Sequence, residues 1–489
     1  MKTASNELHE LIHTLSEKER NQFRKYCMFK TEETSSHYLK LFNEYTKQVE
    51  PDEQQIKQRL QLENFARVKN YLYQQVLSFI ADNESTSTDK EIYNMLVVAD
   101  DLLNRSMFKQ GLTVLNKAAQ IASDLDLHFI LLIINEKKMQ MQNYGSYIHQ
   151  LNERIQYHEH GYKSIIEKIH NEHHYVSYGL KLKVYSLQQD VLKHTEESLK
   201  ELKALVEPEL EKGEGSPATF RAKNYFHISA GFYYQQINQP ERALVHFLKC
   251  LDLFNEKEGY KIYYYRHYTT VLNNLLFCYA YNKQYNEIKK VLDTLKKIKT
   301  KNKFHQLTVL QTIALYETYY LKNVKIPDRK KRLKEIEKKI VPCLNLFQPH
   351  YSIQIIYHFS LNYFIDSDCK KAIEWLNKLD EYENKSVLKS LLCTIKIYKL
   401  IVYYELGKVD YLEYAIPNTY RYLLKQKQYN KLDKLILSAL KKLIFSPTIK
   451  KQKEILSALY TELLSLKNDP LEKQVFEVFY FLEWVESKL

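Results

Sequence analysis

Residues 225–253, YFHISAGFYYQQINQPERALVHFLKCLDL, give the clearest indication of how this chain folds. The apolar and small residues of this stretch recur at intervals that place them on one face of a helix. The residues that mark this spacing, 3, 9, 4 and 3 positions apart, are Gly231, Tyr234, Ala243, Phe247 and Cys250. Helical spacing of apolar residues continues almost without interruption from residue 90 to the end of the chain.

The composition indicates the same fold class. Among 489 residues there are only 9 glycines and 10 prolines, which is too few for the many turns of β-sandwiches and barrels. The chain is also too long to enclose one compact core. We therefore predict an all-α protein that consists of several domains or of one elongated array.

The stretch at 225–253 resembles the tetratricopeptide repeat. In that family, small residues at the eighth, twentieth and twenty-seventh positions let two antiparallel helices approach, and larger residues fill the gaps. The same frame fits this chain near residues 91, 223, 268, 352 and 393, at intervals close to whole multiples of about 41 to 45 residues. This unit is longer than the family's usual unit of about 34 residues. The resemblance implies a right-handed α-solenoid of antiparallel helix pairs.

Breaks in the helical pattern divide the chain into three predicted regions. The polar tract NESTSTD at 83–89 ends an N-terminal helical module, residues 1–85. The segment EPELEKGEGSPAT at 207–219 holds two glycines and two prolines. It separates a first part of the repeats, 90–210, from a second part, 216–489.

The N-terminal module shows clear helix signals. Ser16 and Glu19 have the spacing of a capping box, which predicts that a helix begins there. Before this box, an apolar stripe is formed by Leu8, Leu11, Ile12 and Leu15. Further helices are predicted over residues 38–47, 52–60 and 65–80.

Three segments of this module carry a second resemblance. They are ELIHTLSEKERNQFRKY, HYLKLFNEY and ARVKNYLYQQVLSFI, at residues 10–26, 37–45 and 66–80. They look like the opening of uncharacterised helical-repeat proteins from Bacteroidota. The resemblance covers about the first 120 residues and implies a helical repeat without implying an activity.

The net charge of +13 is concentrated in two segments. Residues 283–339 hold 17 basic and 6 acidic residues, and residues 421–453 hold 10 and 1. The amino terminus lacks the continuous apolar core of a signal peptide, and the six cysteines form no close pair. We therefore expect a cytoplasmic protein with reduced thiols and no segment that spans a membrane.

No catalytic or nucleotide-binding motif occurs in the sequence. The dispersed glycines form neither GxxxxGK[ST] nor GxGxxG, and HExxH and GxSxG are also absent. Five histidines lie close together in the chain, namely His158, His160, His170, His173 and His174. His170 and His174 have a spacing that zinc can use, but no further ligand motif completes the set. We expect solvated or partner-facing histidines, no metal or cofactor, and no enzyme activity.

The leading functional hypothesis is a scaffold that binds a protein or peptide on a concave face. Most of the 41 tyrosines and 21 phenylalanines are expected to pack between helices. In a tetratricopeptide array, however, the first helix of each pair lines the inner surface. The resemblance places there Tyr225, Phe232, Gln235, Asn273, Phe277, Tyr357 and Phe364. Such a mixed aromatic and amide lining suits a peptide or a partner helix.

The alternative hypothesis is a regulator that binds nucleic acid. The helices at 52–60 and 65–80 could form a helix-turn-helix motif, with Arg67 and Lys69 near the start of its second helix. The basic segments 283–339 and 421–453 are the other candidates for this binding. In the first of them, one helix face carries Lys331, Lys334 and Lys338. A solvated helix surface would account for the same lysines without any nucleic-acid partner. The sequence does not predict the oligomeric state.

Overall fold

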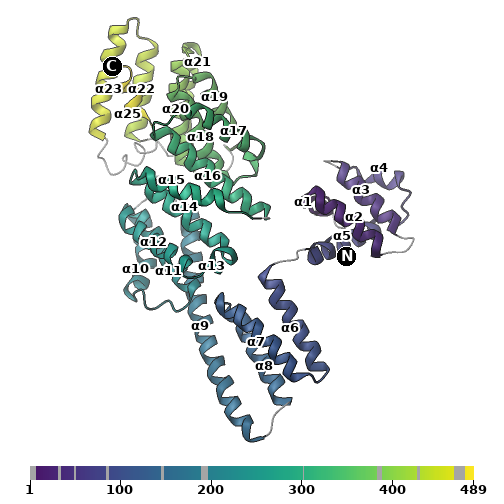
Figure 1. The fold of residues 1–489 in the computed structure, drawn as a ribbon. Helices are drawn as coiled ribbons and strands as arrows, with labels where there is room; N and C mark the ends of the chain where they lie inside the picture. The colour runs from purple at the N-terminus through teal and green to yellow at the C-terminus, as the bar shows by residue number, and fades with distance from the viewer. Residues whose placement is uncertain are drawn as a thin grey trace. The chain divides into compact units, whose positions relative to one another are not determined.

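The structure is a computed structural model that describes residues 7–30, 35–48, 51–83, 87–144, 148–188, 196–300, 302–382, 388–426, 430–466 and 480–489. Within these ranges the regular secondary structure is entirely helical (Figure 1), which confirms the predicted all-α class. No membrane-spanning segment is found among the described helices. The chain divides into two compact units, residues 1–121 with 137–147 and residues 122–136 with 148–489. This division falls inside the predicted region 90–210.

Five helices are described in the N-terminal module. They are α1 Glu7–Thr14, α2 Glu17–Lys30, α3 Ser35–Lys47, α4 Glu53–Arg59 and α5 Phe65–Asn83. Helices α1, α3 and α5 contact one another around a core that includes Leu8 and Phe42, both fully buried. The capping box before α2 is confirmed, because the backbone N of Ser16 donates to Oε2 of Glu19 at 2.7 Å and the backbone N of Glu19 donates to Oγ of Ser16 at 3.3 Å.

The next five helices depart from the predicted spacing. They are α6 Thr88–Asn104, α7 Phe108–Asp124, α8 His128–Tyr144, α9 Ile148–Gln188 and α10 Glu196–Glu211. The sequence predicts three helix pairs between residues 91 and 223, but α9 runs unbroken for 41 residues, the length of a whole predicted unit. It contains no proline, and its Gly179 lies at a close approach to Tyr225 rather than at a turn.

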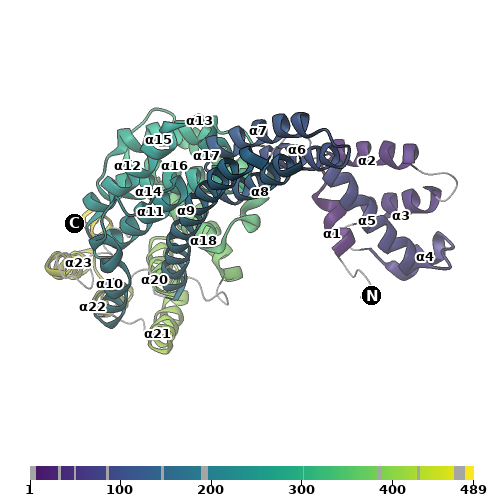
Figure 2. The same ribbon diagram turned by 90° about the horizontal axis from the view of Figure 1, so that it is seen from below.

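From residue 220 the chain forms helices that pack mainly against their neighbours along the sequence, seen from a second direction in Figure 2. They are α11 Phe220–Gln236, α12 Pro240–Glu256, α13 Glu258–Tyr263, α14 Tyr265–Tyr281, α15 Tyr285–Lys297, α16 Lys303–Asn323, α17 Arg329–Ile340, η1 Val341–Leu346, α18 Pro349–Ile365, α19 Cys369–Asn377, η2 Lys378–Tyr382, α20 Lys389–Glu405, α21 Val409–Lys425, α22 Lys431–Ile444, α23 Ile449–Leu466 and α25 Phe481–Glu486. The frames predicted near 223, 268, 352 and 393 fall on the pairs α11/α12, α14/α15, α18/α19 and α20/α21.

One turn joins the two helices of each of these pairs. The turn has three residues, and the middle one adopts the left-handed backbone conformation, with φ between 54° and 66°. At six such links in the described chain, the middle residue is Ser106, Asp126, Asn238, Lys283, Ser367 or Gly407. In the α11/α12 link, the N–H of Gln239 donates to the carbonyl of Tyr234 at 2.8 Å and that of Asn238 to Gln235 at 3.1 Å. The other five links repeat both bonds, which satisfy the last carbonyls of the first helix.

A small residue lets α11 and α12 approach each other, as the sequence predicts. A Cβ atom added to Gly231 would lie 2.5 Å from the ring of Phe247. Ala243 and Cys250, on the facing helix, are fully buried. The aromatic ring therefore rests directly on the backbone of α11.

We expect Lys283→Gly to raise the free energy of unfolding by about 0.5–1 kcal/mol, because glycine adopts a left-handed conformation without the steric cost of a Cβ atom. The converse change, Gly407→Ala, should lower it by about 1 kcal/mol, since a Cβ atom there meets no neighbour within 4 Å and only the backbone is strained. Urea denaturation measures both. Equal stability of the two variants and the wild type would contradict this account of the turn.

Gly231→Ala should destabilise the protein by about 1–3 kcal/mol, because the added methyl group overlaps the ring of Phe247. Gly215→Ala is the matched control, as no atom lies within 4 Å of the position of its Cβ. Thermal unfolding followed by circular dichroism compares the two. A control that loses as much stability as Gly231→Ala would show that the close approach is not the cause.

Candidate functional site

The positions predicted to line a partner-binding surface are accessible on α11 and α14. Tyr225, Phe232 and Gln235 on α11 are half-buried, and so is Asn273 on α14. Phe277 on α14 is 45% exposed although it is a large apolar residue. We call these five residues the α11–α14 face.

The corresponding positions on α18 differ. Phe364 is half-buried, but Tyr357 is only 1% exposed. Its ring packs edge-on against Tyr398 of α20, with centroids 5.6 Å apart, and α18 also contacts α16. The prediction that Tyr357 contacts a partner is therefore wrong, because neighbouring helices cover this side of α18.

Polar residues of the α11–α14 face fix the helices beside them. Oη of Tyr225 and Nε2 of His267 on α14 are hydrogen-bonded at 3.3 Å. The amide of Gln235 donates to Sγ of Cys278 at 3.7 Å, and Oδ1 of Asn273 accepts from the hydroxyl of Tyr351 on α18 at 2.8 Å. These bonds hold α11, α14 and α18 in place, so Phe232 and Phe277 are presented on a fixed frame.

The residues predicted for nucleic-acid binding in the N-terminal module separate in the structure. Arg67 is exposed on α5. Lys69, two residues later, is 4% exposed, and its ammonium group forms an ion pair with Glu53 of α4. The prediction that Lys69 contacts phosphate is therefore wrong, because its buried ammonium group is paired with Glu53 and this ion pair links α4 to α5.

The lysines predicted on α17 form an exposed basic face. Lys331, Lys334 and Lys338 all point away from the buried side of the helix, which consists of Leu333, Ile336 and Ile340. Glu337 does not neutralise this face. Its carboxylate accepts hydrogen bonds from Nε1 of Trp375 at 3.2 Å and from the hydroxyl of Tyr363.

Three of the clustered histidines line a small pocket of about 270 Å³ between α9 and α10. His170, His173 and His174 are exposed there, and Nε2 of His174 lies 3.0 Å from Oε2 of Glu209. Burial alone would raise the pKa of Glu209, but hydrogen bonds from Lys212 and His174 outweigh this effect and lower it. His160 is exposed. His158 is not solvated as predicted, since it is 4% exposed and its Nδ1 lies 3.0 Å from Oδ1 of Asn135.

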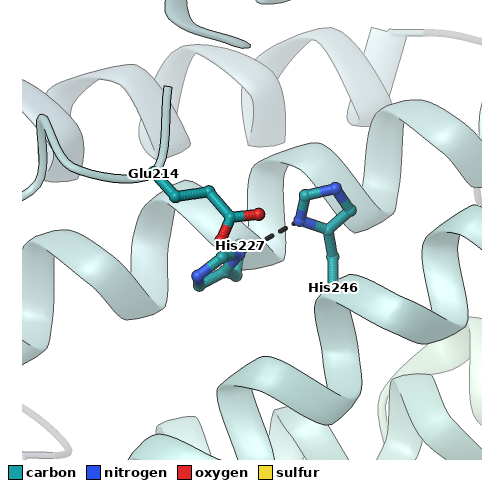
Figure 3. A group of neighbouring side chains, drawn as sticks. All are labelled: Glu214, His227 and His246. Atoms are coloured by element: carbon teal, nitrogen blue, oxygen red, sulfur yellow. Dashed lines mark hydrogen bonds between the residues drawn. The ribbon is translucent and has the colours of Figure 1, made fainter. Parts of the chain in front are cut away.

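A different group of side chains meets between the middle of α11 and the middle of α12. Nδ1 of His227 on α11 lies 3.0 Å from Nδ1 of His246 on α12. Glu214, in the loop before α11, completes a set whose potential ligand atoms all lie within 4.8 Å of one another (Figure 3). The sequence does not indicate this group, because its members are 13 and 19 positions apart and match no ligand motif.

The six cysteines carry no disulfide bond, as expected for reduced thiols. Cys250, Cys278 and Cys393 are buried and the other three are partly buried. Burial raises the pKa of Cys27 to about 11 and that of Cys278 to about 12, so these thiols are protonated and unreactive at pH 7.

Comparisons with protein-family models, curated proteins and solved structures find no match to this chain.

Proposed function

We propose that the chain is a non-enzymatic scaffold that binds a protein segment on the α11–α14 face. In this proposal the helix pairs continue as a right-handed, tetratricopeptide-like solenoid, and the first helix of each pair faces the concave side. The observation that supports it is Phe277, which remains 45% exposed in the middle of a helix whose neighbours are fixed by hydrogen bonds.

The chemistry of the α11–α14 face suits an amphipathic peptide. Phe232 and Phe277 offer rigid apolar area, and aromatic contacts of this kind contribute strongly to binding because few side-chain rotations are lost. Gln235 and Asn273 add amide groups at the edge of this face. Each makes one hydrogen bond to a neighbouring helix, and a side-chain amide has further donor and acceptor capacity that a peptide backbone can use. The α11–α14 face carries no formal charge, so we expect a partner segment with few charged residues.

Phe277→Ala should weaken binding of a selected peptide about tenfold or more, the loss expected when a central aromatic contact is removed. Peptides are first selected by display on the immobilised full-length protein, and their affinities are then measured by fluorescence anisotropy. Val245→Ala is the control, because Val245 is an apolar residue of α12 with a similar exposure of 50%. If both variants bind as tightly as the wild type, the peptides dock elsewhere and the proposal fails.

A second function, nucleic-acid binding through α17, is favoured by one observation. Because Glu337 bonds to Trp375 and Tyr363, Lys331, Lys334 and Lys338 face solvent with less neutralisation than the sequence indicates. Three lysines on one helix face can neutralise phosphates, whose binding weakens as salt rises.

The double variant Lys331→Glu with Lys334→Glu should abolish binding to random duplex DNA or RNA, because both lysines would contact phosphate. Gel-shift titrations at several salt concentrations measure the affinity and its salt dependence. Arg67→Glu tests the N-terminal module separately, and it should leave binding through α17 unchanged. The absence of any shift at low salt would exclude this second function.

A further inference from the structure

We propose that Glu214, His227 and His246 form a binding site for a single divalent cation of the zinc type. The cation would join the loop at residues 212–219 to both helices of the α11/α12 pair. This inference is independent of the α11–α14 face, since none of the three residues belongs to it.

The distances fit a metal ion with little rearrangement. Two imidazole nitrogens bound to one tetrahedral zinc ion at about 2.0–2.1 Å lie about 3.3 Å apart. The two Nδ1 atoms are 3.0 Å apart, so a small separation of the rings admits the ion. Figure 3 shows the carboxylate of Glu214 lying beside both rings, from where it can supply the third ligand.

The two rings are held in position by aromatic neighbours. Tyr234 stacks on His246 at a centroid distance of 5.5 Å and an angle of 18°. Phe226 packs edge-on against His227 at 5.2 Å. Fixed ring orientations favour metal binding, because little side-chain freedom is lost when the ion enters.

The two imidazole rings share one proton between their facing nitrogens. Nδ1 of His227 and Nδ1 of His246 are hydrogen-bonded at 3.0 Å, so one of these atoms carries a hydrogen and the other offers its lone pair. When that proton moves to Nε2 of the same ring, both Nδ1 lone pairs are available to one ion.

The loop that carries Glu214 is anchored to α9. The side-chain amide of Asn171 donates to the carbonyl of Ser216 at 2.8 Å, and its oxygen accepts from the backbone N of Ala218 at 2.8 Å. Gly213, just before the glutamate, has φ of +79°, which turns the chain at that point. The carboxylate is therefore presented by a fixed loop, although the residue itself is exposed.

Two histidines and one glutamate form a ligand set suited to zinc, with water in the fourth position. The competitor for the carboxylate is Lys249, whose ammonium group forms an ion pair with Glu214. Lys249 contacts Oε1 of this carboxylate, so Oε2 can bind the cation while the ion pair remains. The positive charge of Lys249 nevertheless opposes a cation at this position.

Zinc titration of the chelator-treated full-length protein tests the site, with a chromophoric chelator as competitor. We expect the wild type to bind one equivalent, and Glu214→Gln and His246→Asn each to weaken binding by about tenfold or more. Lys249→Met should tighten binding, because the carboxylate then has no competing cation. Circular dichroism confirms that each variant is folded, and Co²⁺ absorption reports nitrogen and oxygen ligation directly.

The histidine pocket beside α10 provides the internal control. His174→Asn removes its central residue and should leave the zinc affinity of the wild type unchanged. Loss of binding in His174→Asn alone would place the ion in that pocket and overturn the proposal. Absence of zinc binding at micromolar concentration would also overturn it, as would equal affinities of the wild type, Glu214→Gln and His246→Asn.

Discussion

The three-residue turn between paired helices is the constraint on which the described architecture depends. Its middle residue takes a left-handed conformation, so the chain reverses direction and the second helix packs on the first. Five of the six residues at this position, among them Asn238 and Lys283, are not glycine. Each carries a local conformational cost of about 1 kcal/mol. Packing between the two helices must exceed this cost. In the α11/α12 pair, Gly231 allows that packing because the ring of Phe247 occupies the space where a Cβ atom would lie.

Packing between neighbours determines which surfaces remain free. On α11 and α14, polar side chains of one helix face form hydrogen bonds to the neighbouring helix. Phe277 on the same face remains exposed. On α18 the same face is covered by α16 and α20, and Tyr357 is buried. Equivalent positions in a repeated frame therefore do not have equivalent exposure, since different neighbouring helices cover them.

The α11/α12 pair combines several features in one element of the fold. Close contact at Gly231 brings the two helices together, and the same proximity places His227 against His246. The amide of Asn171 on α9 fixes the loop that supplies Glu214. A cation bound by these residues would stabilise the closed pair through mass action, because the ligand set is assembled only in the folded chain.

The amino-acid sequence predicted the helical class, the helix pairs α11/α12, α14/α15, α18/α19 and α20/α21, the capping box at Ser16 and the small residue Gly231 that allows close packing. These features depend on local spacing and on the low content of glycine and proline, which any stretch of chain reveals. The burial of Lys69 and Tyr357, and the meeting of Glu214, His227 and His246, became visible only in the folded chain. Burial and ligand geometry depend on which helices become neighbours in space, and local periodicity contains no information about that choice.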